Sequence, residues 1–423
     1  MTEDVITAIK AREILDCRGL PTLEVDVHVG GALAGRADVP AGRSTGRNEA
    51  AELRDGGTRF GGFGVRQAVK NVEGEIAAAL VGEGLDQAAI DQQLIELDGT
   101  VNKGRLGANA LVGVSLSVAR ARAFVAGVPL YRHLNGDSRV LPVPQVNLIN
   151  GGRHASNDLD FQEFIVMPVG ATTFMQAMEI ATETNLVLRE ILVSRYGKVA
   201  ANVGDEGGFA PPIGDSQEAL ELLHEAAERA GHLPSIVFAV DCAATHLYDD
   251  DSKTYRVDGR TLDREGMIEV CETLVRDWGV VSLEDPLDEE DFDGFRELTQ
   301  RVDAQIVGDD LFVTNPVRLS RGIEAGAADA LLWKVNQIGT LTEALEAATL
   351  ARVNGYAVVV SERSGETEDP FIADAVVALG AGQIKTGAPV RGERTAKYNA
   401  LLRIEDELGQ DATYAGSAYR EPH

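Results

Sequence analysis

Six short apolar runs in the second half of the sequence each end in an ionisable residue. From the second run onward, these ends recur every 22 to 29 residues, with helical patterns such as 338–353 between them. One charged end is ordinary, because a strand stops where polarity begins, but six in succession, acids before bases, predict a cluster at one edge of a sheet. The six residues are Asp241, Glu284, Asp309, Lys334, Arg363 and Lys385.

The three acids predict a metal site. Asp241, Glu284 and Asp309 on neighbouring strand ends would repel one another unless a cation lay among them. Ligation by oxygen alone favours Mg²⁺, which keeps water or substrate oxygens in its remaining positions. The sequence has no HxH or HExxH pattern that would indicate zinc. The alternative is that the acids are separate, solvated or salt-bridged side chains.

The two lysines predict a base. Lys334 and Lys385 follow later strands, so in a closed barrel they would face the acids across the mouth. An ammonium beside a dication has its pKa lowered by like charge, which makes a lysine a usable general base. The alternative for either lysine is a structural salt bridge to the acids.

Two further segments offer an acid for the opposite side. Glu206 lies in the turn VGDEGGF (203–209), and Gln162 with Glu163 begins an apolar run in DFQEF. Asp-Glu-Gly is also an ordinary turn, so Glu206 alone is weak evidence. Together with the metal ligands and a lysine base, these residues suit proton abstraction beside a carboxylate, followed by loss of a β-leaving group.

The spacing of the runs predicts the elements that must carry these residues. A strand and a helix at this period are typical of parallel βα units, and eight such units close into a barrel of about 250 residues with its chemistry at the strand C-termini. Asn135-Gly136-Asp137, followed by two prolines, marks the expected boundary. We therefore expect domains at 1–136 and 137–423.

The part before the boundary has a mixed α+β pattern. Strands are expected at 22–29 and before Pro40, and helices at 63–82, 86–97 and 107–126. The Gly-rich stretches 30–46 and 55–64 are expected to be long loops, which in compact domains are often lids.

The composition of the chain excludes some classes of binding partner. The 423 residues include 39 Lys and Arg against 67 Asp and Glu, a net charge of −28, which argues against nucleic acid or a membrane surface as partner. The three cysteines have no CxxC spacing, and a reducing cytoplasm fits them. We expect no apolar leader and no apolar run near the ~20 residues that span a bilayer. No G-x-G-x-x-G follows a strand, which excludes a dinucleotide fold.

Over nearly its whole length the chain resembles the enolase (phosphopyruvate hydratase) family. The resemblance implies an α/β fold with a C-terminal enolase-type β/α barrel and a smaller N-terminal α+β capping domain. It also implies removal of water from 2-phosphoglycerate or a related phosphorylated acid, two Mg²⁺ per active site with the second binding with substrate, and a homodimer or homo-octamer. The shared motifs include VPAGRSTG, LINGGRHA, DFQEF, VGDEGGFAP, SLEDP, VGDDLFVTN, LLWKVNQIGTLTEA, SGETED, GQIKTG and AKYNALLRIEDELG.

The resemblance also implies a role for each site residue. Lysine or histidine bases working with one or two Mg²⁺ ions are known for the enolase superfamily. The first Mg²⁺ would be held by Asp241, Glu284 and Asp309, and the second by Ser44 of the lid. Lys334 would take the proton at C2, and Glu206 with Glu163 would assist departure of hydroxide. The remaining groups would be Lys385 and Gln162 at substrate and metal, Arg363 and Ser364 at phosphate, and the mobile-loop His154.

A few positions depart from the family pattern near the ligand. Arg43 replaces a lid alanine, Glu362 replaces the histidine before the phosphate-binding arginine, and His246 replaces a glutamate. One hypothesis is a divergent paralogue that forms carboxyphosphonoenolpyruvate, with Arg43 and Glu362 contacting the substrate. The other is an ordinary enolase in which Glu362 and His246 exchange roles as a compensating pair. A third, a non-catalytic binding descendant, fits poorly because the base and metal ligands are all retained.

Overall fold

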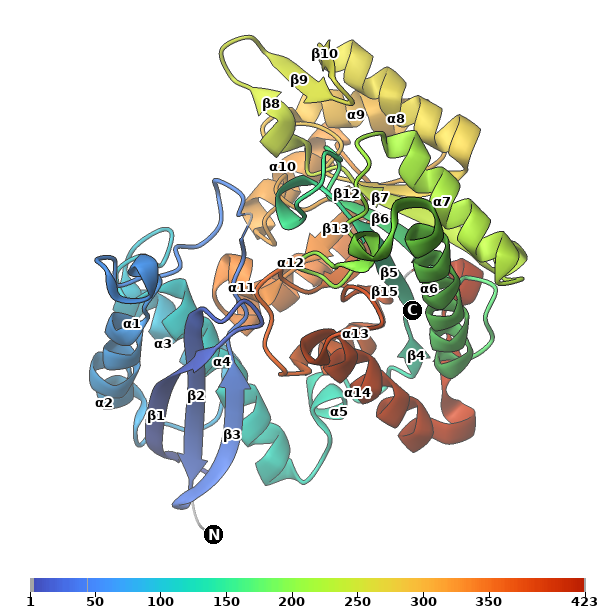
Figure 1. Ribbon diagram of the computed structural model, residues 1–423. Helices are drawn as coiled ribbons and strands as arrows, with labels where there is room; N and C mark the ends of the chain where they lie inside the picture. The colour runs from blue at the N-terminus through green and yellow to red at the C-terminus, as the bar shows by residue number, and fades with distance from the viewer. Residues whose placement is uncertain (1–3, 44, 422–423) are drawn as a thin grey trace.

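A three-stranded antiparallel sheet opens the chain in the computed structural model, which describes residues 4–43 and 45–421 (Figure 1). Its strands β1 (Ile6–Leu15), β2 (Pro21–Val29) and β3 (Ala32–Asp38) pair in chain order. The two predicted strands are confirmed, whereas β1 was not predicted. Its buried and exposed positions do not alternate regularly along the strand.

Helices pack on this sheet much as expected. The buried helix α4 (Ala108–Ala126) lies against β2 and β3, and α3 (Gln87–Asp98) begins at Asp86, whose side chain accepts a hydrogen bond from the Ala89 amide. The single helix expected at 63–82 is instead α1 (Arg66–Asn71) and α2 (Ala77–Leu80), joined by a π-helical turn at Val72–Ile76 that contains Gly74.

Helix α4 also changes one expectation about apolar runs. By length and composition it is a candidate membrane span, so the prediction of no such run was wrong. However, 78% of the tested window is buried inside the protein. The core helix of a globular domain has this property.

The second part is a closed eight-stranded barrel, in the order β11-β12-β13-β14-β15-β5-β6-β7 (Figure 1). The strands are β5 (Val143–Asn150), β6 (Glu163–Met167), β7 (Val237–Asp241), β11 (Val280–Glu284), β12 (Gln305–Gly308), β13 (Ala330–Trp333), β14 (Ala357–Ser361) and β15 (Gly382–Lys385). The expectation of eight parallel units was wrong for β6, which is antiparallel to both neighbours.

This reversal places a site residue. Because β6 runs backwards, its first residue, Glu163, pairs with the last residues of its neighbours, Asn150 and Asp241. Glu163 therefore lies on the same rim as the C-terminal ends of the other strands.

Helices surround the barrel and link its strands. Several begin at a side-chain cap, for example Asp215, Asp263 and Thr340, which satisfies amides that the helix leaves free. The helices are α6 (Phe174–Tyr196), α7 (Ser216–Arg229), α8 (Arg264–Trp278), α9 (Phe292–Arg301), α10 (Pro316–Ala325), α11 (Val335–Ile338), α12 (Leu341–Val353), α13 (Phe371–Leu379) and α14 (Gly392–Leu408).

Short elements complete the chain. The predicted boundary at 136/137 falls between α5 (Leu130–Leu134) and β4 (Val140–Leu141), and it stays a prediction. Strand β4 pairs with β16 (Thr413–Tyr414), and β8 (Tyr248–Asp249), β9 (Thr254–Val257) and β10 (Arg260–Leu262) form a separate sheet. All three cysteines are free thiols.

The segment between β3 and α1 connects the N-terminal part to the mouth of the barrel. Ala41 forms a bridge with Gly365, the Ala50 amide donates to the Gln337 carbonyl at 2.8 Å, and Arg47 forms an ion pair with Asp288 at 3.0 Å. These contacts hold the segment over the strand ends that carry the predicted site.

We expect Gly35→Ala to destabilise the N-terminal part. A Cβ at Gly35 would lie 1.9 Å from the Ser117 carbonyl oxygen and 2.7 Å from the Ala121 nitrogen, both backbone atoms of α4 that cannot turn away. Overpacking of this kind costs about 1–3 kcal/mol. Gly74→Ala is the control, because a Cβ there meets nothing within 4 Å. Equal unfolding midpoints in denaturant for the two variants would contradict this packing.

Candidate active site

Lys385 lies at the centre of the acidic rim. At the end of β15, its Nζ is 2.7 Å from Glu163 Oε2, 2.8 Å from Asp241 Oδ2 and 2.8 Å from Glu284 Oε2. Burial opposes the charge on Lys385, but the three carboxylates hold its pKa well above the ordinary value. The structure thus brings three strand ends around one ammonium.

Lys334 and Asp309 form the next part of the rim. Lys334 Nζ lies 2.6 Å from Asp309 Oδ2, and Gln337 Nε2 donates to Asp309 Oδ1 at 2.8 Å. Burial is the largest single effect and disfavours the charged amine, but the nearby carboxylates, Asp309 first and then Glu284, together raise the pKa of Lys334. The expected lowering of this pKa assumed a dication beside the lysine.

Glu284 shows how much negative charge the rim carries. Burial raises its pKa well above the ordinary value, and Asp241 and Asp309 raise it further, against the effect of Lys385 and Lys334. The predicted acids are therefore close enough to interact, and their charge exceeds what the two lysines neutralise.

A histidine and a glutamate form another buried pair. His154 Nδ1 lies 2.5 Å from Glu206 Oε1, and Asn150 donates to Glu206 Oε2 at 2.7 Å. Burial disfavours both charges, but their mutual attraction raises the pKa of His154 and lowers that of Glu206. Next to them, burial raises the pKa of Glu163 to about 7. This corner thus holds an ionised carboxylate beside a carboxyl that can be protonated near neutral pH.

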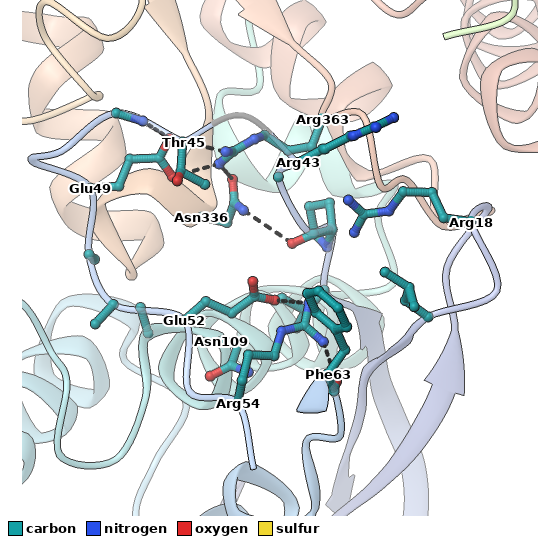
Figure 2. A pocket seen from close by; sticks show the side chains of 18 of the residues that line it. Arg18, Arg43, Thr45, Glu49, Glu52, Arg54, Phe63, Asn109, Asn336 and Arg363 are labelled. Carbon is teal, nitrogen blue, oxygen red and sulfur yellow. Dashed lines mark hydrogen bonds and ion pairs between the residues drawn. The ribbon is translucent and has the colours of Figure 1, made fainter. Parts of the chain in front are cut away.

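Arg363 connects the barrel to the N-terminal segment. Its guanidinium donates to both carboxylate oxygens of Glu49, at 2.9 and 3.0 Å, and to Asn336 Oδ1 at 3.0 Å (Figure 2). Ser364 Oγ accepts from the backbone amide of Arg43 at 2.8 Å. The two predicted phosphate-binding residues thus meet the segment that covers the mouth.

A cavity of about 690 Å³ opens beside Arg363. Figure 2 shows Glu49, Glu52, Arg54 and Asn336 around it, between the N-terminal segment and the barrel loops. Arg18, Arg43 and Arg363 also line it. A passage of this size can admit a small organic anion.

A second, much smaller cavity of about 20 Å³ collects most of the predicted residues. Two of the remaining residues, Glu284 and Asp309, form ion pairs with Lys385 and Lys334, which line this cavity. Arg43 lines the larger cavity, and Ser44 lies outside the described residues. The residues that line the small cavity are His154, Gln162, Glu163, Glu206, Asp241, Lys334, Ser361, Glu362, Arg363, Ser364 and Lys385.

The departures from the family pattern have partners within the chain. Arg43 forms an ion pair with Asp205 at 3.0 Å, and Glu362 Oε2 accepts a hydrogen bond from Arg394. The hypothesis of a compensating pair between Glu362 and His246 was wrong, because Arg394 takes that place. Burial lowers the pKa of His246 to about 4, with Arg153 acting in the same direction.

Sequence reasoning missed the residues that hold the predicted ones. Arg394 lies on α14, two residues before the AKYN motif, Glu49 lies in a loop, and Asn336 lies in α11. None ends an apolar run, so only the family motifs pointed near them. Asp285 was missed as well: its carboxylate accepts the amides of Asp309 at 2.9 Å and Asp310 at 2.7 Å, which fixes the turn after β12.

The acids fit a divalent cation. Among the described residues, a group of three carboxylates within 4.8 Å consists of Asp285, Asp309 and Asp310, which shares only Asp309 with the predicted set. Asp285 is already engaged by two amides, however. Asp241 and Glu284 instead face an ammonium that a cation could displace, and the excess negative charge there suits hard oxygen ligation.

Comparison with known proteins agrees with this geometry. The family model for the enolase C-terminal TIM barrel domain matches residues 138–423, and the model for the enolase N-terminal domain matches 6–134. Relatives named Enolase include those of Methanopyrus kandleri, 58% identical over 417 residues and 97% of each chain, and Methanocaldococcus jannaschii, 56% identical over 419 residues, 99% of this chain and 98% of the relative. The chain therefore belongs to the enolase family of hydro-lyases.

Proposed function

We propose that the chain removes water from 2-phosphoglycerate to give phosphoenolpyruvate, with Mg²⁺ as cofactor. The observation that carries this proposal is that Lys334 and the His154–Glu206 pair line the same small cavity. Lys334 follows β13 and Glu163 begins β6, which is four strands away in the eight-stranded ring. A base and an acid on opposite faces are what loss of a proton from one carbon and hydroxide from the next requires.

The metal ligands in this proposal are Asp241, Glu284 and Asp309. When bound, Mg²⁺ would neutralise these acids and stabilise the negative charge that develops on the substrate carboxylate. A second Mg²⁺ would bind with substrate at Ser44.

Lys334 takes the proton from C2. Asp309 Oδ2 holds the amine at 2.6 Å, and Gln337 orients that carboxylate by donating to Oδ1 at 2.8 Å. Lys385 and Gln162 contact the substrate and the first metal site. Gln162 Nε2 already donates to Asp241 Oδ2 at 3.1 Å, which orients that carboxylate.

The groups around Glu206 donate a proton to the departing hydroxide, so that the hydroxide leaves as water. Glu206 and His154 share a short contact and can pass one proton between them. Glu163, with its pKa near 7, assists from β6. Asn150 keeps Glu206 oriented toward this corner.

Arg363 and Ser364 bind the phosphate. The Arg363 guanidinium is oriented by Glu49 and Asn336 and is buried. A planar guanidinium presents two parallel donors, which suits a phosphate as well as a carboxylate.

The wider setting belongs to the same proposal. The substrate is a small phosphorylated acid, the protein works in the cytoplasm as a homodimer or homo-octamer, and neither nucleic acid nor a membrane is a partner. Residues 1–136 form the capping domain and 137–423 the catalytic barrel.

Ordinary dehydration is favoured over the alternative, formation of carboxyphosphonoenolpyruvate. That alternative required Arg43 to bind an extra acidic group on the substrate. The Arg43 guanidinium instead forms an ion pair with Asp205 in the chain. A non-catalytic descendant is disfavoured because the proposed base and metal ligands remain in contact with one another.

We expect turnover of 2-phosphoglycerate to phosphoenolpyruvate with Mg²⁺, at rates of about 1–10³ s⁻¹, which are typical of enzymes on their own substrates. The absorbance of the enol product in the ultraviolet measures the reaction directly. Chelation of divalent ions should abolish the rate, and added Mg²⁺ should restore it. A rate a thousandfold lower would reject 2-phosphoglycerate as the substrate.

We expect Lys334→Ala to abolish exchange of the C2 proton of 2-phosphoglycerate with solvent while leaving the fold intact, because no other amine contacts Asp309 among the described ion pairs. Nuclear magnetic resonance in D₂O measures this exchange separately from loss of hydroxide. Lys253→Ala is the matched control, since Lys253 is exposed and pairs only with Asp250 in the described part of the chain. Exchange at the wild-type rate in Lys334→Ala would show that the base lies elsewhere.

A further inference from the structure

Glu362 has one carboxylate oxygen bound and the other buried without a partner. The residue follows β14, directly before Arg363 and Ser364, and is 4% exposed. Its Oε2 accepts from Arg394, whereas Oε1 has no hydrogen-bond partner among the described residues. A buried carboxylate oxygen left in this way is costly, so its state needs an explanation.

Arg394 determines which oxygen is bound. Its side chain is fully buried and also donates to the backbone carbonyls of Arg363 at 2.8 Å, Ser364 at 2.9 Å and Asp205 at 3.0 Å. A guanidinium can only donate hydrogen bonds, so Oε2 must act as an acceptor. Any proton on the Glu362 carboxyl therefore belongs on Oε1.

The groups around Glu362 favour that proton. Burial raises its pKa well above the ordinary value, and Glu206, Glu163 and Glu366 raise it further, against the effect of Arg394. The remaining neighbours add little positive charge of their own. The Lys385 carbonyl accepts a hydrogen bond from the Glu362 amide, and the Lys385 ammonium is shared by three carboxylates. Lys397 forms an ion pair with Glu366, and the Tyr398 hydroxyl donates to the Gly387 carbonyl.

Glu362 lines the small cavity together with Arg363 and Ser364, the residues proposed to bind phosphate. An ionised carboxylate at this position would repel a phosphate, whereas a neutral carboxyl group would offer it a hydrogen-bond donor. The family has histidine here, which can also donate.

We propose that Glu362 contributes to phosphate binding as a neutral acid, with Oε2 accepting from Arg394 and the Oε1 hydroxyl donating to a phosphoryl oxygen held by Arg363 and Ser364. The inference rests on the proposed function in so far as the ligand is a phosphorylated acid. On this proposal, Glu362 replaces the histidine of the family as a hydrogen-bond donor to phosphate, and the substrate stays the same.

Two substitutions distinguish a donor from a charge. In Glu362→Gln, Arg394 fixes the amide oxygen as its partner, so the amide N–H takes the place of the Oε1 hydroxyl. We expect the KM for 2-phosphoglycerate at pH 6.5 and saturating Mg²⁺ to stay within about threefold of wild type for Glu362→Gln, and to rise more than about tenfold for Glu362→Ala, which offers no donor. Thermal unfolding of each variant identifies any loss of fold.

The pH dependence gives a second readout. Since the protonated form binds, the ratio of wild-type KM to Glu362→Gln KM should stay constant or rise between pH 6.5 and 9.5. Ionisation of the phosphate itself affects both proteins equally and cancels in the ratio. A falling ratio, an equal loss in Glu362→Gln and Glu362→Ala, or binding more than about tenfold tighter in Glu362→Gln would overturn the proposal.

Binding of inorganic phosphate tests the role of Glu362 independently of the proposed substrate. If 2-phosphoglycerate is not turned over, the proposed substrate fails, but calorimetry with phosphate still tests the donor. We expect wild type and Glu362→Gln to bind phosphate with similar affinity and Glu362→Ala to bind it at least about tenfold more weakly. Equal affinity in all three proteins would show that Glu362 does not touch the anion.

Discussion

The buried carboxylates at the mouth of the barrel outnumber the ammonium groups that face them. Lys385 forms ion pairs with Glu163, Asp241 and Glu284, and Lys334 forms one with Asp309. A charge removed from water must be paired. An incompletely paired carboxylate either takes up a proton, as the raised pKa values of Glu163 and Glu284 indicate, or is stabilised by further positive charge. The strands of the barrel hold these acids together despite their repulsion, so the site is prepared for a cation and for a substrate that brings one.

The same constraint accounts for the N-terminal segment. Arg363 is buried and would be costly without a counter-charge, and Glu49 provides one with two hydrogen bonds. Because Glu49 comes from the segment after β3, the N-terminal part and the barrel are joined at the proposed phosphate site. Asn336 and Gln337, two and three residues after Lys334, connect Arg363 and Asp309 to the same short helix, α11. Binding of phosphate to Arg363 would therefore change the contact of Arg363 with Glu49, in the segment that covers the mouth.

The regular part of this arrangement could be predicted from sequence. Apolar runs that end in charge predicted the strand ends, because a parallel barrel buries its strands and exposes only their ends. The reversed direction of β6 could not be predicted, since an apolar run has no direction. Arg394 and Glu49 were missed for another reason: each matters through a partner more than 30 residues away, which local pattern does not reveal. The expected pairing of Glu362 with His246 was wrong on the same ground, because the sequence does not show that Arg394 lies beside Glu362 in the fold.

The central claim is that Asp241, Glu284 and Asp309 together hold the catalytic cation. Anomalous diffraction from crystals soaked in Mn²⁺, which takes similar oxygen ligands, tests it most directly. The account predicts a peak between the carboxylates of these three residues, with Lys385 Nζ moved away from Asp241 and Glu284. A peak among Asp285, Asp309 and Asp310 instead, or none at the rim, would contradict it.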